Sequence, residues 1–211
     1  MKKKLFRYSI RVALFLFVII GLGASIYQIP PKATINKFDE YPITTLLHIV
    51  PAILFLIIGL LQHSSAFRDR FTKAHRILGY VFVLSSVSIG ISALCIVYVF
   101  PYSGVLEQIP ITLFACLFIF FALRGVFHII NKKVQQHKND MLRVFCLGLG
   151  ASMFRLLIVP AVVIGFDPKE VVPYLFWLSF GGMLLLCEVY IKTRVIRKLK
   201  RINLTPHLKA S

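Results

Sequence analysis

The chain has 211 residues, of which 58% are hydrophobic and only 16% are charged. Soluble domains carry about a quarter charged residues, so this composition excludes a soluble globular protein and indicates a chain that lies in lipid. The net charge of +17 does not indicate nucleic acid as a partner. A nucleic-acid site gathers its basic residues on one soluble face, whereas here they lie between apolar runs.

Six apolar runs are long enough to cross a bilayer, which takes about 20 residues in a helix. In chain order they cover approximately residues 12–29, 43–62, 77–100, 109–130, 142–164 and 173–191. The first run follows a lysine-rich start, as in a signal peptide, but it continues far enough to span, and we interpret it as an uncleaved helix. Short connections predict one all-α transmembrane domain over residues 1–211, with a basic tail at 192–211.

Basic residues decide the orientation, because Lys and Arg near helix ends stay on the cytoplasmic side. The N-terminus, the second and fourth connections and the tail carry 20 of them, against three on the opposite side (Lys32, Lys37 and Lys169). We therefore predict six helices in the cytoplasmic (inner) membrane, with both chain ends in the cytoplasm. The expected partner is the lipid bilayer, and the sequence leaves open a homo-oligomer or a membrane-complex partner.

Ionisable side chains at bilayer depth mark candidate sites, since each costs at least about 2.5 to 3.5 kcal/mol on insertion scales. They are His48, Arg124, Arg155 and Glu188. His48 lies roughly 8 Å, and Arg155 roughly 13 Å, from the outer end of its helix, at a rise of 1.5 Å per residue. We predict that these two residues form an outer polar pair.

The cytoplasmic end of the predicted bundle is richer in polar residues. Asp140 follows His137 by three residues and is expected to orient that imidazole. His63 and His128 are interpreted as interfacial residues that reach headgroups. Histidines at one depth on neighbouring helices are typical of bundles that ligate haem b or a metal, which makes His75 and His137 candidate ligands.

Several short segments resemble a bacterial family of predicted multi-pass membrane proteins, catalogued as domain of unknown function 2306. The resemblance covers about residues 38–192 and rests on Leu47-His48, Gly59-Leu-Leu-Gln62, Phe67-Arg-Asp-Arg70, His75-Arg76-x-x-Gly79, the segment His137 to Arg143, Phe154-Arg155 before Pro160, and Glu188-Val-Tyr. It implies that the residues of interest are His48, His75, His137, Arg143, Arg155 and Glu188. The family supplies no reaction.

Three classes of function follow from these residues. In the first, a membrane redox or metal-dependent protein, His75, His137 and Glu188 ligate haem b or a divalent metal and Arg143 neutralises it. The second is a non-enzymatic assembly or scaffold subunit. The third is a small-solute or proton-coupled transporter with a relay of His48, Arg155 and Glu188. The sequence contains no nucleophile elbow, P-loop or Rossmann fingerprint, and it leaves open whether the protein is an enzyme.

Overall fold

The computed structural model describes residues 16, 19, 42–99 and 101–204. Within these residues all regular structure is helical: α3 (Pro42–Gln62), α4 (Ser65–Arg70), α5 (Thr72–Val99), α6 (Val105–Ile130), α7 (Val134–Ile164), α8 (Pro168–Phe176), the π-helix η1 (Trp177–Gly181) and α9 (Gly182–Leu204). The predicted span at residues 12–29 lies outside the described residues, apart from Leu16 and Ile19.

The other predicted spans all coincide with helices. Within the part of the chain that the structure describes, four helical stretches are long and apolar enough to cross a membrane: Thr72–Val99, Val105–Ile130, Val134–Ile164 and Pro168–Arg197. The shorter apolar helix Leu46–Gln62 lies within α3. Helices α5 and α7 begin at Thr72 and Val134, before the predicted spans, because helical hydrogen bonding continues beyond the apolar run into polar sequence.

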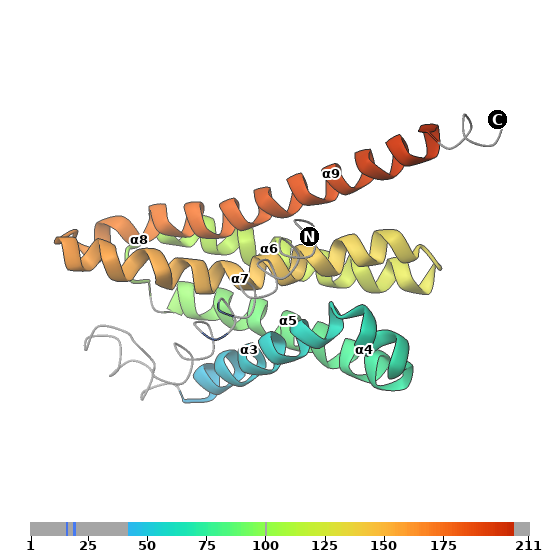
Figure 1. The fold of residues 1–211 in the computed structure, drawn as a ribbon. Coiled ribbons are helices and arrows are strands. Elements are labelled where there is room, and N and C mark those ends of the chain that lie inside the picture. The colour runs from blue at the N-terminus through green and yellow to red at the C-terminus, as the bar shows by residue number, and fades with distance from the viewer. Residues whose placement is uncertain (1–15, 17–18, 20–41, 100, 205–211) are drawn as a thin grey trace, which may run out of the picture.

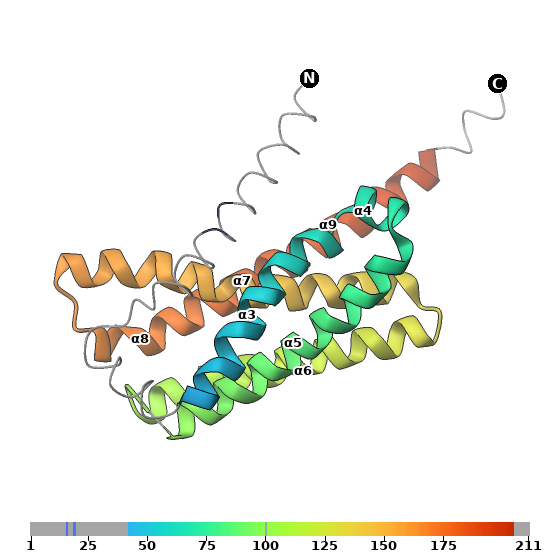
Figure 2. The same ribbon diagram turned by 90° about the horizontal axis from the view of Figure 1, so that it is seen from below.

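Helices α5, α6 and α7 form the centre of the bundle, with α3 packed on α5 and α9 packed on α7 (Figure 1). The short α4 joins α3 to α5 and lies beside the N-terminal end of α5 (Figure 2). Helix α9 runs along α7 and then diverges from it, so that its last turns project from the bundle (Figure 1).

Phenylalanine rings fill the region where α3, α5, α6 and α7 meet. The ring of Phe55 stacks on Phe82, with centroids 4.6 Å apart, and meets Phe118 edge-on at 5.4 Å and Phe145 at 6.1 Å. Gly148 makes room for this cluster, because a Cβ at this position would overlap the Phe55 ring. The missing side chain at Gly148 thus lets the Phe55 ring of α3 lie directly against α7.

The two ends of the bundle differ in charge. The basic end contains α4 and the α6–α7 turn, with Arg68, Arg70, Lys73, Lys132, Lys133 and Lys138. The acidic end contains the α5–α6 and α7–α8 turns. Here the buried Glu107 accepts hydrogen bonds from the backbone N–H groups of Tyr102 and Ser103 at 2.9 and 2.7 Å. Asp167 caps α8 by accepting from the N–H of Lys169 at 2.8 Å.

Candidate functional site

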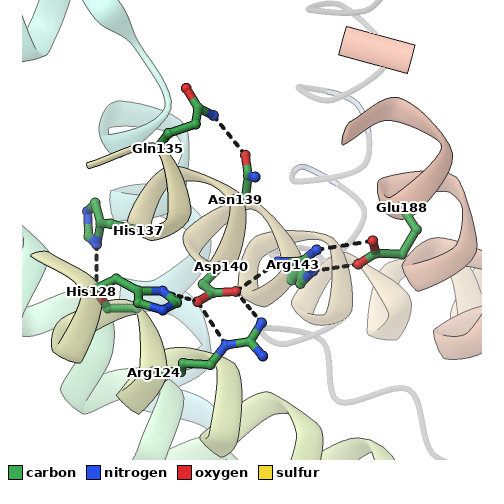
Figure 3. A network of polar contacts seen from close by, with 9 residues as sticks. Arg124, His128, Gln135, His137, Asn139, Asp140, Arg143 and Glu188 are labelled. Atoms are coloured by element: carbon green, nitrogen blue, oxygen red, sulfur yellow. Dashed lines mark hydrogen bonds and ion pairs between the residues drawn. The ribbon is translucent and has the colours of Figure 1, made fainter. Parts of the chain in front are cut away.

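Asp140 on α7 is the most buried charged side chain at the basic end, with 1% of its surface exposed. Arg124 of α6 donates to both of its carboxylate oxygens, from Nε to Oδ2 at 3.0 Å and from Nη2 to Oδ1 at 2.6 Å. Nδ1 of His128 lies 2.8 Å from Oδ2, and Nη1 of Arg143 donates to Oδ1 at 2.8 Å (Figure 3). One carboxylate therefore joins two guanidinium groups and an imidazole.

Arg143 extends this network to α9. Its Nε and Nη2 donate to the two carboxylate oxygens of Glu188 at 2.5 and 3.1 Å, a bidentate ion pair (Figure 3). We call this series of four bonded side chains, Arg124, Asp140, Arg143 and Glu188, the polar chain. It links α6, α7 and α9, and its two guanidinium charges balance its two carboxylate charges.

The short α6–α7 hairpin explains why these residues meet. Arg124 lies eight residues before Lys132 in the turn and Asp140 lies eight residues after it. Equal spacing on two antiparallel helices places both residues about 12 Å from the turn, at 1.5 Å per residue. His128 follows Arg124 by four residues and Arg143 follows Asp140 by three, so each pair shares one face of its helix.

Aromatic rings support both arginines. The guanidinium carbon of Arg124 lies 4.8 Å from the ring centre of Phe120 and 4.9 Å from that of Phe121. The corresponding carbon of Arg143 lies 5.5 Å from the Phe121 ring centre. A cation over a ring face gains about 0.5 to 2 kcal/mol, depending on its desolvation. Phe121, which belongs to the phenylalanine core, thus contacts both arginines of the polar chain.

The imidazole of His137 has a different partner from the one predicted. Its Nδ1 lies 2.9 Å from the carbonyl oxygen of Gly125, and since a carbonyl only accepts, Nδ1 carries the hydrogen. The prediction that Asp140 orients His137 was wrong, because the carboxylate bonds to His128 instead. The missing side chain of Gly125 makes room for Met141 of α7, because a Cβ at this position would overlap the Met141 side chain. The interpretation of His128 as a headgroup ligand missed this bond.

The predicted ligand set is only partly brought together. Arg143 and Glu188 pair directly, whereas His137 and Glu188 lie on opposite sides of Asp140 (Figure 3). Nδ1 of His75 is buried and has no hydrogen-bond partner among the described residues. Across residues 42–99 and 101–204, no group of three or more His, Cys, Asp or Glu side chains is arranged to hold a metal ion. The shared site of His75, His137 and Glu188 stays a prediction.

The predicted outer pair makes its hydrogen bonds elsewhere. Nδ1 of His48 lies 2.9 Å from Oγ of Ser92 on α5, and Nη1 of Arg155 donates to the carbonyl of Ala151 on its own helix at 3.0 Å. The pairing of His48 with Arg155 stays a prediction. The sequence did not identify Ser92 as the partner of His48. One turn before Ser92, the hydroxyl of Ser88 donates to the carbonyl of Leu47 on α3 at 2.9 Å.

A hollow at the acidic end lies between the α5–α6 turn and α8. Its volume is about 500 Å³, and it is lined by Tyr102, Ser103, Leu106, Lys169, Glu170 and Tyr174. Burial raises the pKa of the Tyr102 hydroxyl, and the carboxylates of Asp167 and Glu107 add to this effect. The phenol is therefore neutral at physiological pH and available as a hydrogen-bond donor.

A family described as "predicted membrane protein (DUF2306)" matches residues 45–191. The matched region includes α5, α6 and α7, nearly all of α3, and the whole polar chain. No curated protein and no solved structure matches the chain.

Proposed function

The chain belongs to the DUF2306 family of predicted membrane proteins, and we propose that it transports a small solute across the membrane together with protons. The polar chain carries this proposal. In it Arg124 bonds to Asp140, Asp140 to Arg143, and Arg143 to Glu188, across helices α6, α7 and α9. Arg124 and Glu188 lie inside predicted spans, and ionisable groups in such positions characterise ion and proton pathways in membrane proteins.

Energetics favour transport over a scaffold role for the polar chain. Each charge within a membrane helix costs at least about 2.5 to 3.5 kcal/mol on insertion scales. Buried ion pairs often contribute no more stability than apolar residues of the same volume. A bundle that needed only cohesion would be served by the close contacts that Gly148 and the phenylalanine core already provide. The charges are better explained by a function that uses them.

Within the polar chain, Glu188 is the best candidate for the group that takes up and releases a proton. Asp140 is 1% exposed and is held by Arg124, His128 and Arg143 together, which favours a permanent carboxylate. The side chain of Glu188 is 33% exposed and has Arg143 as its hydrogen-bond partner. Loss of its charge would break one ion pair and leave the cluster around Asp140 intact.

Polar groups in the acidic half of the bundle form the rest of the proposed solute pathway. The hollow at the acidic end has a volume within the range of about 300 to 1,000 Å³ that is usual for ligand pockets. The bonded pair of His48 and Ser92 lies between this end and the phenylalanine core, and so does Arg155. Because the core separates them from the polar chain, transport requires the two halves to open alternately.

We further propose that the basic end is cytoplasmic and that residues 12–29 form a sixth span, which places both chain ends in the cytoplasm of an inner membrane. The distribution of Lys and Arg supports this topology. Reporter fusions are expected to be active on the periplasmic side after residues 36 and 168 and on the cytoplasmic side after residue 134. The opposite activity at any of these points would reject the topology.

Transport is tested with purified protein in liposomes by recording charge displacement on solid-supported membranes. A panel of amino acids, organic acids and sugars is applied with and without a pH gradient. We expect a pH-dependent current for a solute of the panel, and at least a tenfold smaller current for Glu188→Gln. Asp69→Asn is the control, because this exposed carboxylate pairs with Arg68 of its own helix, outside both the polar chain and the hollow. Absence of current across the panel would count against the proposal.

A second candidate function is binding of haem b or a divalent metal by His75, His137 and Glu188, with Arg143 neutralising the group. The observation in its favour is that Nδ1 of His137 donates to a backbone carbonyl, as in many metal-ligating histidines, which leaves Nε2 as an acceptor. Glu188 would have to leave Arg143. The absorption spectrum and metal content of the same purified protein decide this case. If both lack a cofactor and no solute is carried, a scaffold role remains.

A further inference from the structure

The last membrane helix contains an irregular segment in its middle. Helices α8 and α9 are joined without a break by η1, Trp177–Gly181, in which the hydrogen bonds follow the wider π pattern. Such segments are rare, occur mostly as single turns, and are frequent at functional sites and bends. In this chain η1 ends in Gly181, and α9 begins with Gly182.

These two glycines are not required by packing. A Cβ added to Gly182 would meet no atom within 4 Å, and one added to Gly181 would meet only Cζ of Phe114, at an ordinary distance of 3.5 Å. The situation differs from Gly148, where a Cβ would overlap Phe55. What glycine adds at positions 181 and 182 is backbone freedom, at a cost in helix stability.

Beyond η1, helix α9 lies against α7. The contact contains the bidentate pair of Arg143 and Glu188, and the neighbouring thiols of Cys146 and Cys187 lie across the same interface. Cys187 is 2% exposed. The last turns of α9 diverge from the bundle (Figure 1). The ion pair is thus the charged contact that holds α9 to α7.

We propose that α9 is a hinged arm: it turns about η1 and Gly182, and the pair of Arg143 and Glu188 latches it to α7. When the latch opens, Arg143 keeps its bond to Asp140, so the rest of the polar chain stays in place. The buried face of α9, with Cys187, then becomes accessible to water. This inference goes beyond the transport proposal, because it holds whether or not the protein carries a solute.

The arm is tested by the rate at which N-ethylmaleimide alkylates Cys187 in the full-length protein in liposomes, followed by mass spectrometry. Burial protects Cys187 in the latched state, and thiols react as thiolates in contact with water. Glu188→Gln is expected to raise the rate about tenfold. Equal Cys187 rates in both proteins would overturn the latch.

The hinge is tested by adding Gly181→Ala and Gly182→Ala to Glu188→Gln. Both methyl groups fit without overlap, and alanine only restricts the backbone. We expect the Cys187 rate to fall about fivefold from that of Glu188→Gln alone. If Glu188→Gln merely loosened the whole bundle, the two alanines would leave the Cys187 rate unchanged. An unchanged rate would therefore overturn the hinge. Glu107→Gln should give the wild-type rate, and a raised rate there would also contradict a local latch.

Discussion

Asp140→Ala is expected to lower the free energy of unfolding by about 3 to 5 kcal/mol, the usual loss when one partner of a buried ion pair is removed. Without this carboxylate, the guanidinium groups of Arg124 and Arg143 face each other across a buried position. For a chain of this size the change corresponds to a fall in melting temperature on the order of 10 °C. Thermal unfolding in detergent, followed by thiol-reactive dye or intrinsic fluorescence, measures it.

Asp69→Ala is the matched control for this prediction. Asp69 also pairs with an arginine, Arg68, at 3.0 Å, but its side chain is 68% exposed. Exposed pairs are worth about 0 to 1 kcal/mol, so the melting temperature should change little. A comparable fall in melting temperature for Asp69→Ala and Asp140→Ala, or no fall for either, would contradict the prediction that the buried ion pairs of Asp140 stabilise the fold.

The helices could be predicted from the sequence because lipid imposes a simple requirement on the backbone. Each span must satisfy all its own hydrogen bonds, so the apolar runs at residues 43–62 and 109–130 recur as α3 and α6. The helix ends were less predictable, because hydropathy reports where lipid ends and not where helical hydrogen bonding ends. Helix α7 therefore extends back to Val134 through the polar segment that contains Asp140.

The site was harder to predict than the fold. Sequence spacing identifies which residues share a helix face, as the four-residue separation of Arg124 and His128 does. It does not determine which of two nearby groups a side chain reaches. Asp140 bonds to His128 of the opposite helix and not to His137 of its own, because Gly125 offers His137 a backbone carbonyl. The symmetric position of Arg124 and Asp140 about the α6–α7 turn was the available signal.

The second large effect is expected at Gly148 on α7, which the Phe55 ring of α3 lies against. A Cβ at this position would overlap the ring of Phe55, which is 2% exposed and packed against Phe82, Phe118 and Phe145. Overpacking of a filled core costs about 1 to 3 kcal/mol, and more when several rings must move together. Alanine gains up to about 1 kcal/mol over glycine in a helix, which does not offset this cost. Gly148→Ala is therefore expected to destabilise by about 2 kcal/mol.

A comparison with Gly182→Ala and a double substitution isolates the packing contribution. Gly182 is also helical, but an added Cβ there meets nothing within 4 Å, so alanine should leave the melting temperature unchanged or raise it. Phe55→Leu shortens the side chain that Gly148→Ala overlaps. In a double-mutant cycle we expect the two changes to couple by about 1 to 2 kcal/mol, with Phe55→Leu relieving the loss. Additive effects in the cycle, or equal changes for both glycines, would mean that the position of the Phe55 ring against α7 does not depend on a missing side chain at Gly148.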